Sequence, residues 1–537
     1  MRRWFGEFGK YASVVAVAVV LVMGCADTGL AATTDDSVAT QANVRLFGAK
    51  GDAVSDDTAA VQAAVNSVVA GGGVVVFPAG TYMVTSVNMS PGTELRGEPG
   101  AIIKRPKNQP NHTMTFQTAK KRWNSASDSP PLVLRSLVID GNRDNQGAYN
   151  RYELEQAALV YLDANPAGAG RLRVIVDGCT FKDCVGDALE IVRNVDLSVS
   201  NCSFSNCFRG AFVFVGGNTK GRITNCVVKG TKDARGIDVE IAAAGHPSVS
   251  TTLDGPVPAS ATRIRCVNLT GWPTGGYAFV GANRIAYTGI TGNTLTGCSG
   301  ALAHDSGAVI TGDTQSVDLQ MSNVELNGCF DIAARERSKM TFSKITWGDM
   351  SNLAVFNVDA ADSSSVQVDS SKFLIPGWST TRRIYRANDV RISNTEFTLS
   401  SRRGTAGSTV SIAVGAPYPP GAKHVEMNNC VFGVSPDSPM TDKFHGLDIA
   451  PGTAELHKLV LNNCRFGANL DRGISVLNGG FVQADGCYFD STIGIWFSGS
   501  PSHVADIHLN RCSYGPSNKT NYHAGAKNGN VLLQVAP

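Results

Sequence analysis

Four carboxylates and three arginines lie close together in the sequence, and their types suit the cleavage of sugar polymers. They are Asp187, Glu190, Asp238 and Glu240, with Arg193, Arg209 and Arg235. Glycoside hydrolysis needs an acid and a base or nucleophile roughly 5 to 10 Å apart. Elimination from a uronate needs a base and a cation that neutralises the sugar carboxylate. Whether these side chains can act together depends on the elements that carry them.

A cysteine that recurs at nearly constant spacing indicates what those elements are. "DLSVSNCSFSNCFRGAF" (196–212) aligns in register with "DLQMSNVELNGCFDIAA" (318–334). In shorter copies of this pattern, the step from Cys179 to Cys202 is nearly equal to the step from Cys202 to Cys226. In other copies the same place is held by Val324, Ile345, Ser371 and Thr395. A period of this length, with short strands and Asn or Gly turns, predicts a solenoid in which each coil buries its apolar face on the next.

The recurring cysteines are best interpreted as small buried side chains. Their position alternates with Val, Ile, Ser and Thr, which do not replace metal ligands, and a zinc site needs four ligands at one point. Stacked coils lie about 4.8 Å apart, so equivalent cysteines form an internal ladder. Cys184 and Cys207 belong to a second ladder. Disulfides between adjacent coils, such as Cys202 with Cys179 or Cys226, are the alternative.

The ladder determines which side chains of the following strand face outward. Alternation places Glu190, Val213 and Asp238 on the outer face of successive coils. Glu190 and Asp238 then share a column two coils apart, about 9.6 Å between backbones, and Glu240 lies about 7 Å from Asp238 along the strand. Asp187 lies in the turn that leads into this face. We therefore predict that the four acids are catalytic and that the three nearby arginines bind substrate. Acids on an ordinary solvated sheet face are the alternative interpretation.

Residues 49–84 give a separate indication of the fold. Acidic residues 56 and 57 provide N-cap chemistry for a helix predicted at residues 57–69. Val61, Val65 and Val68 form one apolar helical face, and "VVVFPAGTYMV" then has the pattern of strand, turn and strand. This run resembles the opening segment of the pectate-lyase-like, rhamnogalacturonase/epimerase-type right-handed β-helix superfamily, in which the helix caps the open end of the coil.

The resemblance implies an all-β chain, a single-stranded right-handed parallel β-helix with an N-terminal capping helix. It also implies sugar-polymer enzymes (hydrolases, lyases and epimerases) and tailspikes of the same shape. No Gly-His-Gly or Asp-Pro-His-Glu motif occurs here, and "GDALE" (186–190) has one acid where polygalacturonases have a pair. No catalytic residue is therefore carried over from the superfamily, and the predicted site depends on geometry alone.

Residues 251–312 interrupt the repeat and are predicted to form an inserted small β module. The segment alternates apolar and polar residues between Gly-rich turns and resembles a β module of phage tail proteins. Cys266 and Cys298 lie within it, either as a disulfide or as core. Trp272 and Tyr277 are candidates for stacking on sugars, and the module is equally explicable as decoration.

The N-terminus predicts export. Basic residues precede the apolar run 11–23, which is too short for a membrane span of about 20 residues. Residues 1–31 are the predicted signal peptide, or residues 1–24 if "VMGC" is a lipoprotein box that leaves Cys25 as the lipidated first residue. The expected location is the periplasm, the outer membrane as a lipoprotein, or the extracellular space. A net charge of +2 disfavours nucleic acid and anionic lipid as partners.

We predict three regions after the signal: a cap and first coils at 44–250, the module at 251–312, and the remaining coils at 313–537. The predicted function is cleavage of an acidic polysaccharide, by a glycoside hydrolase in preference to a lyase. A non-catalytic carbohydrate-binding or tailspike-like surface protein and a C5-epimerase are the alternatives. We expect no cofactor, except Ca²⁺ in a lyase. A membrane would be contacted only through the lipid anchor, and a tailspike-like protein would be a homotrimer.

Overall fold

The computed structural model describes most of the chain from residue 40 onward. The described residues are 40–118, 130–147, 154, 156–164, 171–215, 219–229, 235–239, 250–270, 272, 276–281, 283–312, 317–327, 329–334, 338–348, 356–376, 382–400, 407–412, 424–436, 444–449, 458–476, 480–497, 505–524 and 531–537. The predicted signal and Cys25 lie outside them. No helix among the described residues is long and apolar enough to cross a membrane.

The predicted cap helix is present as α1 (Thr58–Val68). Val61, Val65 and Val68 are buried in the core, which confirms the predicted apolar face. The capping contact comes from Asp56, whose Oδ1 accepts the Thr58 N–H at 3.0 Å. Asp57 occupies the N-cap position without a side-chain capping bond. The strand, turn and strand that the sequence predicts next are β3 (Gly73–Phe77) and β4 (Gly80–Met83). The two strands pair in parallel with strands of neighbouring coils, β3 with β6 (Thr93–Gly97) and β4 with β7 (Ala101–Lys104).

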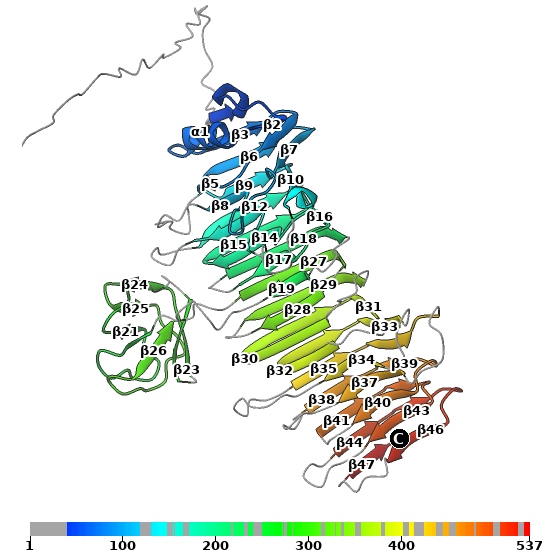
Figure 1. The fold of residues 1–537 in the computed structure, drawn as a ribbon. Helices are drawn as coiled ribbons and strands as arrows, with labels where there is room; N and C mark the ends of the chain where they lie inside the picture. Colours follow the sequence, from blue (N-terminus) through cyan, green and yellow to red (C-terminus); the bar gives the residue numbers. More distant parts are fainter. Residues whose placement is uncertain are drawn as a thin grey trace, which may run out of the picture. The chain divides into compact units, whose positions relative to one another are not determined.

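The rest of the main sheet is a parallel solenoid, and each coil contributes strands to three faces (Figure 1). One coil contains β12 (Leu172–Asp177), β13 (Thr180–Lys182) and β14 (Leu189–Arg193). The next contains β15 (Val195–Ser200), β16 (Ser203–Ser205) and β17 (Gly210–Phe214). Each strand pairs in parallel with its counterpart, β12 with β15, β13 with β16 and β14 with β17. This pattern confirms the predicted single-stranded parallel β-helix.

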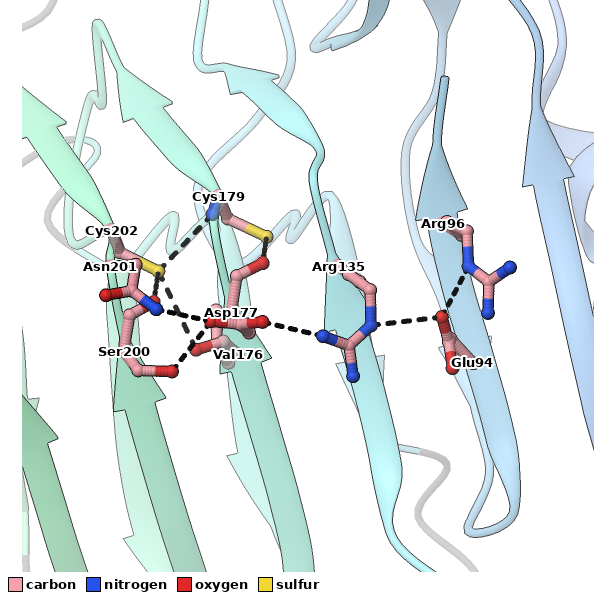
Figure 2. Close-up of polar contacts among 9 residues, drawn as sticks. All are labelled: Glu94, Arg96, Arg135, Val176, Asp177, Cys179, Ser200, Asn201 and Cys202. Carbon is pink, nitrogen blue, oxygen red and sulfur yellow. Dashed lines mark hydrogen bonds and ion pairs between the residues drawn. The ribbon is translucent and has the colours of Figure 1, made fainter. Parts of the chain in front are cut away.

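The cysteine ladder lies inside the coils. Cys179, Cys202 and Cys226 are buried, and Cys226 is in register with Val324 on the next coil of the solenoid. The Cys179 N–H donates to Cys202 Sγ at 3.4 Å, and Figure 2 shows both sulfurs against backbone carbonyls. All described cysteines are free thiols, including Cys184 and Cys207, whose Sγ atoms lie 2.8 Å apart. The structure thus supports the ladder rather than the disulfide alternative.

Charged side chains on the outer face of β6 (Thr93–Gly97), β9 (Leu132–Arg135) and β12 also stack from coil to coil. Arg135 donates to Glu94 and to Asp177, at 3.3 and 2.6 Å (Figure 2). Hydrogen bonds from Ser200 and then Asn201 lower the pKa of the Asp177 carboxyl. Asn201 has a φ of 55°, in the left-handed region that asparagine tolerates at the turn between two faces. These contacts are structural and lie on a different face from the predicted catalytic residues.

The segment at 250–312 forms two antiparallel sheets of its own. The first sheet has the order β20 (Ser250–Thr252), β26 (Val309–Gly312), β22 (Gly276–Val280) and β23 (Asn283–Tyr287), and the second has β21 (Arg263–Arg265), β25 (Thr294–Thr296) and β24 (Gly289–Thr291). Cys266 and Cys298 are free and buried, and Trp272 is also buried, so it is not available for stacking. The Tyr277 side chain is outside the described residues. Strands β18 (Thr219–Lys229) and β27 (Val317–Asn327), which flank the segment, pair directly with each other.

Candidate active site

The predicted catalytic column is present in the strand register of the third face. Strands β11 (Val160–Asp163), β14, β17 and β19 (Arg235–Val239) lie side by side there. Tyr161 pairs with Glu190, Glu190 with Val213, and Val213 with Asp238. Glu190 and Asp238 are therefore two strand spacings apart, as predicted. The catalytic role of these acids stays a prediction.

The side chains of this column are much less exposed than a solvated outer face implies. Glu190 retains 6% of its accessible surface, Val213 0% and Asp238 1%. The expectation of water-exposed acids is therefore wrong for these residues. These acids therefore lie in the interior of the fold rather than on its surface. Burying a carboxylate is costly unless charges or hydrogen bonds compensate it.

Asp187 lies in the turn before β14 and is also fully buried. Its backbone carbonyl accepts the Leu159 N–H at 2.8 Å, which fixes the turn against the preceding coil. Arg209 Nη1 lies 3.6 Å from Asp187 Oδ2. The predicted substrate-binding Arg209 therefore forms an ion pair with a predicted catalytic acid, and only 18% of its side chain is exposed.

Arg193 is engaged in a two-pronged ion pair with Asp163. Its Nε donates to Asp163 Oδ1 at 2.6 Å and its Nη2 to Oδ2 at 2.8 Å. The hydrogen bonds with Asp163 raise the pKa of the Arg193 guanidinium. A guanidinium has five N–H donors, and the bidentate pair with Asp163 uses two of them. The pair fixes the position of Arg193, and the other N–H groups can donate to a substrate.

Tyr161 lies between these charged pairs, half-buried on β11. Burial raises the pKa of its phenol to about 12, with further increases from the negative charges of Asp163 and Glu190. The phenol therefore keeps its proton over the ordinary pH range and is available as a hydrogen-bond donor. We define the N-terminal cluster as Tyr161, Asp163, Asp187, Glu190, Arg193, Arg209 and Asp238.

Two predicted members of the site lie wholly or partly outside the described residues. Glu240 lies outside the described residues, and for Arg235 only the backbone is described, in β19. Within the described part of the chain, no three His, Cys, Asp or Glu side chains converge in a way that would hold a metal ion. The N-terminal cluster is thus built from acid–arginine pairs and a phenol.

Tyr161 and Asp163 could not be predicted from the cysteine spacing because their coil is longer than the period. Val160 pairs with Leu189 and Leu189 with Phe212, and the first of these two steps along the chain is clearly the longer. Counting back from β14 by the cysteine spacing therefore does not lead to the residues of β11. The alternation of the segment "VYLD" (160–163), matched to "LEIV" (189–192), is the signal that would have found them.

Comparison with known families agrees with this architecture. Residues 41–153 match the model of the family described as rhamnogalacturonase A/epimerase, pectate lyase-like. Residues 165–250 match the model of the right-handed β-helix region. These two segments of the chain are thus similar to pectate lyase-like and right-handed β-helix proteins. The predicted superfamily and fold are both confirmed.

Relatives of this β-helix protein match it over limited stretches. Mannuronan C5-epimerase AlgE4 of Azotobacter vinelandii is 34% identical over 125 residues, which is 20% of this chain and 22% of the relative. Plasmin and fibronectin-binding protein A of Streptococcus pneumoniae is 30% identical over 179 residues, 31% of this chain and 24% of the relative. The matches thus span about a quarter or less of the length of these curated relatives.

Among solved structures, one match is the A-module of Azotobacter vinelandii mannuronan C-5 epimerase AlgE4. It aligns with a TM-score of 0.39 and 14% identity, over 92% of this chain and all of that one.

Proposed function

We propose that this β-helix protein is an enzyme that modifies a uronate-containing polysaccharide by proton transfer at the sugar ring, in the N-terminal cluster. The observation that carries the proposal is the position of Tyr161, a half-buried phenol in register with Glu190 and close to the Asp163–Arg193 pair. The matches to mannuronan C5-epimerases support the substrate class.

The chemistry needs three protein groups beside the sugar ring. They are a proton acceptor, a proton donor, and a positive charge near the uronate carboxylate. In epimerisation, the C5–H bond breaks, the electron pair is delocalised into the carboxylate, and a proton returns to C5 from the opposite face. In elimination, the same proton leaves and the C4–O bond breaks, giving a C4–C5 double bond. Tyr161 is the proposed donor, a carboxylate of the cluster the acceptor, and the guanidinium of Arg193 or Arg209 the positive charge.

Glycoside hydrolysis is the second candidate, and it is favoured by one specific observation. Glu190 and Asp238 share a column two strand spacings apart, about 9.6 Å between backbones, near the carboxylate separation of about 6.5 to 9.5 Å in inverting glycosidases. The near-complete burial of both acids makes this candidate weaker, because an inverting enzyme needs a water and a sugar ring between them.

One product assay separates these reactions. The protein is incubated with alginate, polygalacturonate and neutral polysaccharides, with and without added Ca²⁺. Exchange of the C5 proton for deuterium without chain cleavage identifies an epimerase. Ultraviolet absorbance from unsaturated uronate identifies a lyase, and new reducing ends without that absorbance identify a hydrolase. Binding of polymer with none of these products contradicts the enzyme proposal and favours the carbohydrate-binding alternative.

Glu190→Gln is the variant that ties the reaction to the N-terminal cluster. It keeps the size of the side chain and removes its charge, so turnover should fall by about a hundredfold or more if Glu190 transfers a proton. Asp254→Asn, in the segment at 250–312, is the control, because Asp254 pairs with Arg265 at an exposed position. Equal activity of both variants would contradict the assignment.

We also propose that the chain is exported and that its signal ends before Cys25 or near residue 31. Expression in a bacterial host with fractionation and radiolabelled palmitate tests this. Label that is lost in Cys25→Ala identifies a lipoprotein, and unlabelled protein in the medium or periplasm identifies an ordinary signal. Protein retained in the cytoplasm contradicts export.

A further inference from the structure

A second group of polar and aromatic side chains lies on the same face of the solenoid, far from the N-terminal cluster. We define the C-terminal cluster as His445, Asp448, Asp471, Arg472, Ser475 and Trp496. Its strands are β37 (Phe444–Ile449), β40 (Arg472–Val476) and β43 (Ile493–Phe497). Asp448 is in register with Ser475, and Ser475 with Trp496.

This group is separate from the proposed active site. Consecutive register pairs connect Glu190 on β14 to Asp448 on β37 through seven strand spacings. At about 4.8 Å per spacing this is about 34 Å, too far for one sugar ring to contact both. The C-terminal cluster therefore needs an explanation of its own.

Within each of the two coils that contain β37 and β40, a pair of polar side chains three residues apart lies on the same side of the strand. Gly446 and Leu447 are two consecutive buried positions, so His445 and Asp448 both lie on the outer side although they are three residues apart. His445 Nδ1 lies 2.8 Å from Asp448 Oδ1. On the next coil Arg472 Nη1 donates to Ser475 Oγ at 3.3 Å, across the equivalent pair Gly473 and Ile474.

Gly446 and Gly473 lie so close to the neighbouring backbone and core rings that there is no room for a Cβ atom. A Cβ at Gly446 would lie 2.6 Å from the Gly473 carbonyl oxygen and from a ring carbon of Phe466. A Cβ at Gly473 would lie 2.7 Å from the Gly494 carbonyl oxygen and from a ring carbon of Phe489. The strands thus come close to the stacked phenylalanine rings of the core, and that approach turns the neighbouring polar side chains outward.

The coils are also linked to each other. Asp471 Oδ2 lies 3.9 Å from His445 Nε2 and 3.6 Å from Arg472 Nε. The Arg472 guanidinium stacks over the Trp496 ring, 4.1 Å from its centre. His445, Asp448, Asp471 and Arg472 each keep between 17% and 27% of their side-chain surface exposed, and Trp496 is half-buried. These side chains are held in place yet remain accessible.

We propose that the C-terminal cluster is a second saccharide-binding site, which takes an uncharged pyranose ring. Trp496, covered by Arg472 on one face, offers an aromatic surface for the C–H face of a sugar. Asp448 and Asp471 accept hydrogen bonds from sugar hydroxyls, and Arg472 donates them. The Nδ1–H of His445 donates to Asp448, which leaves Nε2 as a further acceptor for a sugar hydroxyl. Two carboxylates against one guanidinium disfavour a uronate carboxylate at this place, so the ligand is recognised by its hydroxyls.

This proposal goes beyond the function proposed for the N-terminal cluster and does not depend on it. A polymer held at both places would gain affinity from the linked second contact. A protein without any enzymatic activity would bind sugar at the C-terminal cluster equally well. Failure of one proposal therefore leaves the other standing.

The test is sugar binding by the full chain, with Glu190→Gln as an inactive background. Neutral gluco-, manno- and galacto-oligosaccharides form one arm and oligouronates the other, measured by saturation-transfer NMR and calorimetry. We expect a neutral oligosaccharide to bind, and Trp496→Ala and Arg472→Gln each to weaken that binding by about tenfold or more, the loss of one charged hydrogen bond or one stacking contact.

The matched control is Arg465→Gln. Arg465 also lies over an aromatic ring, Tyr488 at 5.1 Å, in neighbouring coils but on β39 (Arg465–Phe466) and β42 (Tyr488–Phe489), which belong to a different face. It should leave sugar affinity unchanged. If Trp496→Ala does not fold, Asp448→Asn and Arg472→Gln still decide the question. No binding by the parent protein, binding only of oligouronates, or binding that survives Arg472→Gln and Asp448→Asn would each overturn the proposal.

Discussion

The N-terminal and C-terminal clusters use the same sheet face and the same charged residue types, but they differ in burial. Asp187 and Asp238 are within 1% of full burial, whereas Asp448 and Asp471 keep 20% and 27% of their side-chain surface. A buried charge is sensitive to every neighbouring charge, and a half-exposed one is partly screened by water. The comparison teaches that one face of the solenoid can hold fully buried acids in one place and partly exposed ones in another.

The largest expected effect is on turnover, and it should be confined to the N-terminal cluster. Tyr161→Phe removes the proposed proton donor and should lower turnover of the polysaccharide by about a hundredfold to ten-thousandfold. Tyr488→Phe removes a phenol hydroxyl from another face and should leave turnover unchanged. Initial rates on the polymer identified in the product assay measure both. Similar rates for both variants would remove Tyr161 from the mechanism.

The next largest effect is on the free energy of unfolding. It compares the buried ion pair of the N-terminal cluster with the partly exposed pair of the C-terminal cluster. Arg209→Gln takes away the guanidinium 3.6 Å from fully buried Asp187 and should cost about 3 kcal/mol, as expected for breaking a buried pair. Arg472→Gln, at a partly exposed pair with Asp471, should cost less than about 1 kcal/mol. Denaturant midpoints compare them. Equal shifts would show that burial does not distinguish the two clusters.

A third prediction concerns the glycines that shape the C-terminal cluster. Gly473→Ala places a methyl group against the Gly494 carbonyl and the Phe489 ring and should destabilise the protein by about 1 to 3 kcal/mol. Gly433→Ala, on β36 (Val431–Val434), is the control because nothing lies within 4 Å of its Cβ position. The same denaturant series reads out both. A neutral Gly473→Ala would mean that the close approach to the core does not shape this cluster.

The smallest expected effect is a pH dependence that belongs to the N-terminal cluster. The pKa of Tyr161 is about 12 in the folded chain against 10 when unperturbed, so the folded state holds the proton more tightly. Its contribution to stability is complete below pH 10 and is lost as the pH rises from 10 towards 12. Unfolding midpoints across this window should fall more steeply for the parent protein than for Tyr161→Phe. Parallel curves would contradict the raised pKa.

Much of the fold follows from sequence because the solenoid is periodic. The burial of Cys202, its relation to Cys179 and Cys226, and the register of Glu190 with Asp238 all come from counting along one repeat. The same counting fails where the spacing changes. The coil that leads from Val160 to Leu189 is longer than the cysteine spacing, so counting by that spacing does not predict that Tyr161 lies beside Glu190.

Burial and partners could not be predicted in the same way. Alternation tells which side of the strand Glu190 occupies, but it does not tell whether that side is buried in the folded chain. The contacts of Asp448 are a second example. Its partners His445 and Arg472 reach the outer face only because glycines let the strands approach the core, a tertiary effect that the local pattern does not contain.

The direct pairing of β18 with β27 has a consequence for how this protein can change. The solenoid continues from β19 to β27 and β28 (Cys329–Ala334) as if the whole segment 240–316 were a simple connection. Each doubling of a flexible loop costs only about 0.6 kcal/mol, so even a structureless chain of that length costs about 2 kcal/mol more than a short turn. We therefore expect this junction to tolerate the replacement of the inserted segment by another domain, in evolution or by design. The coils on either side would keep their register.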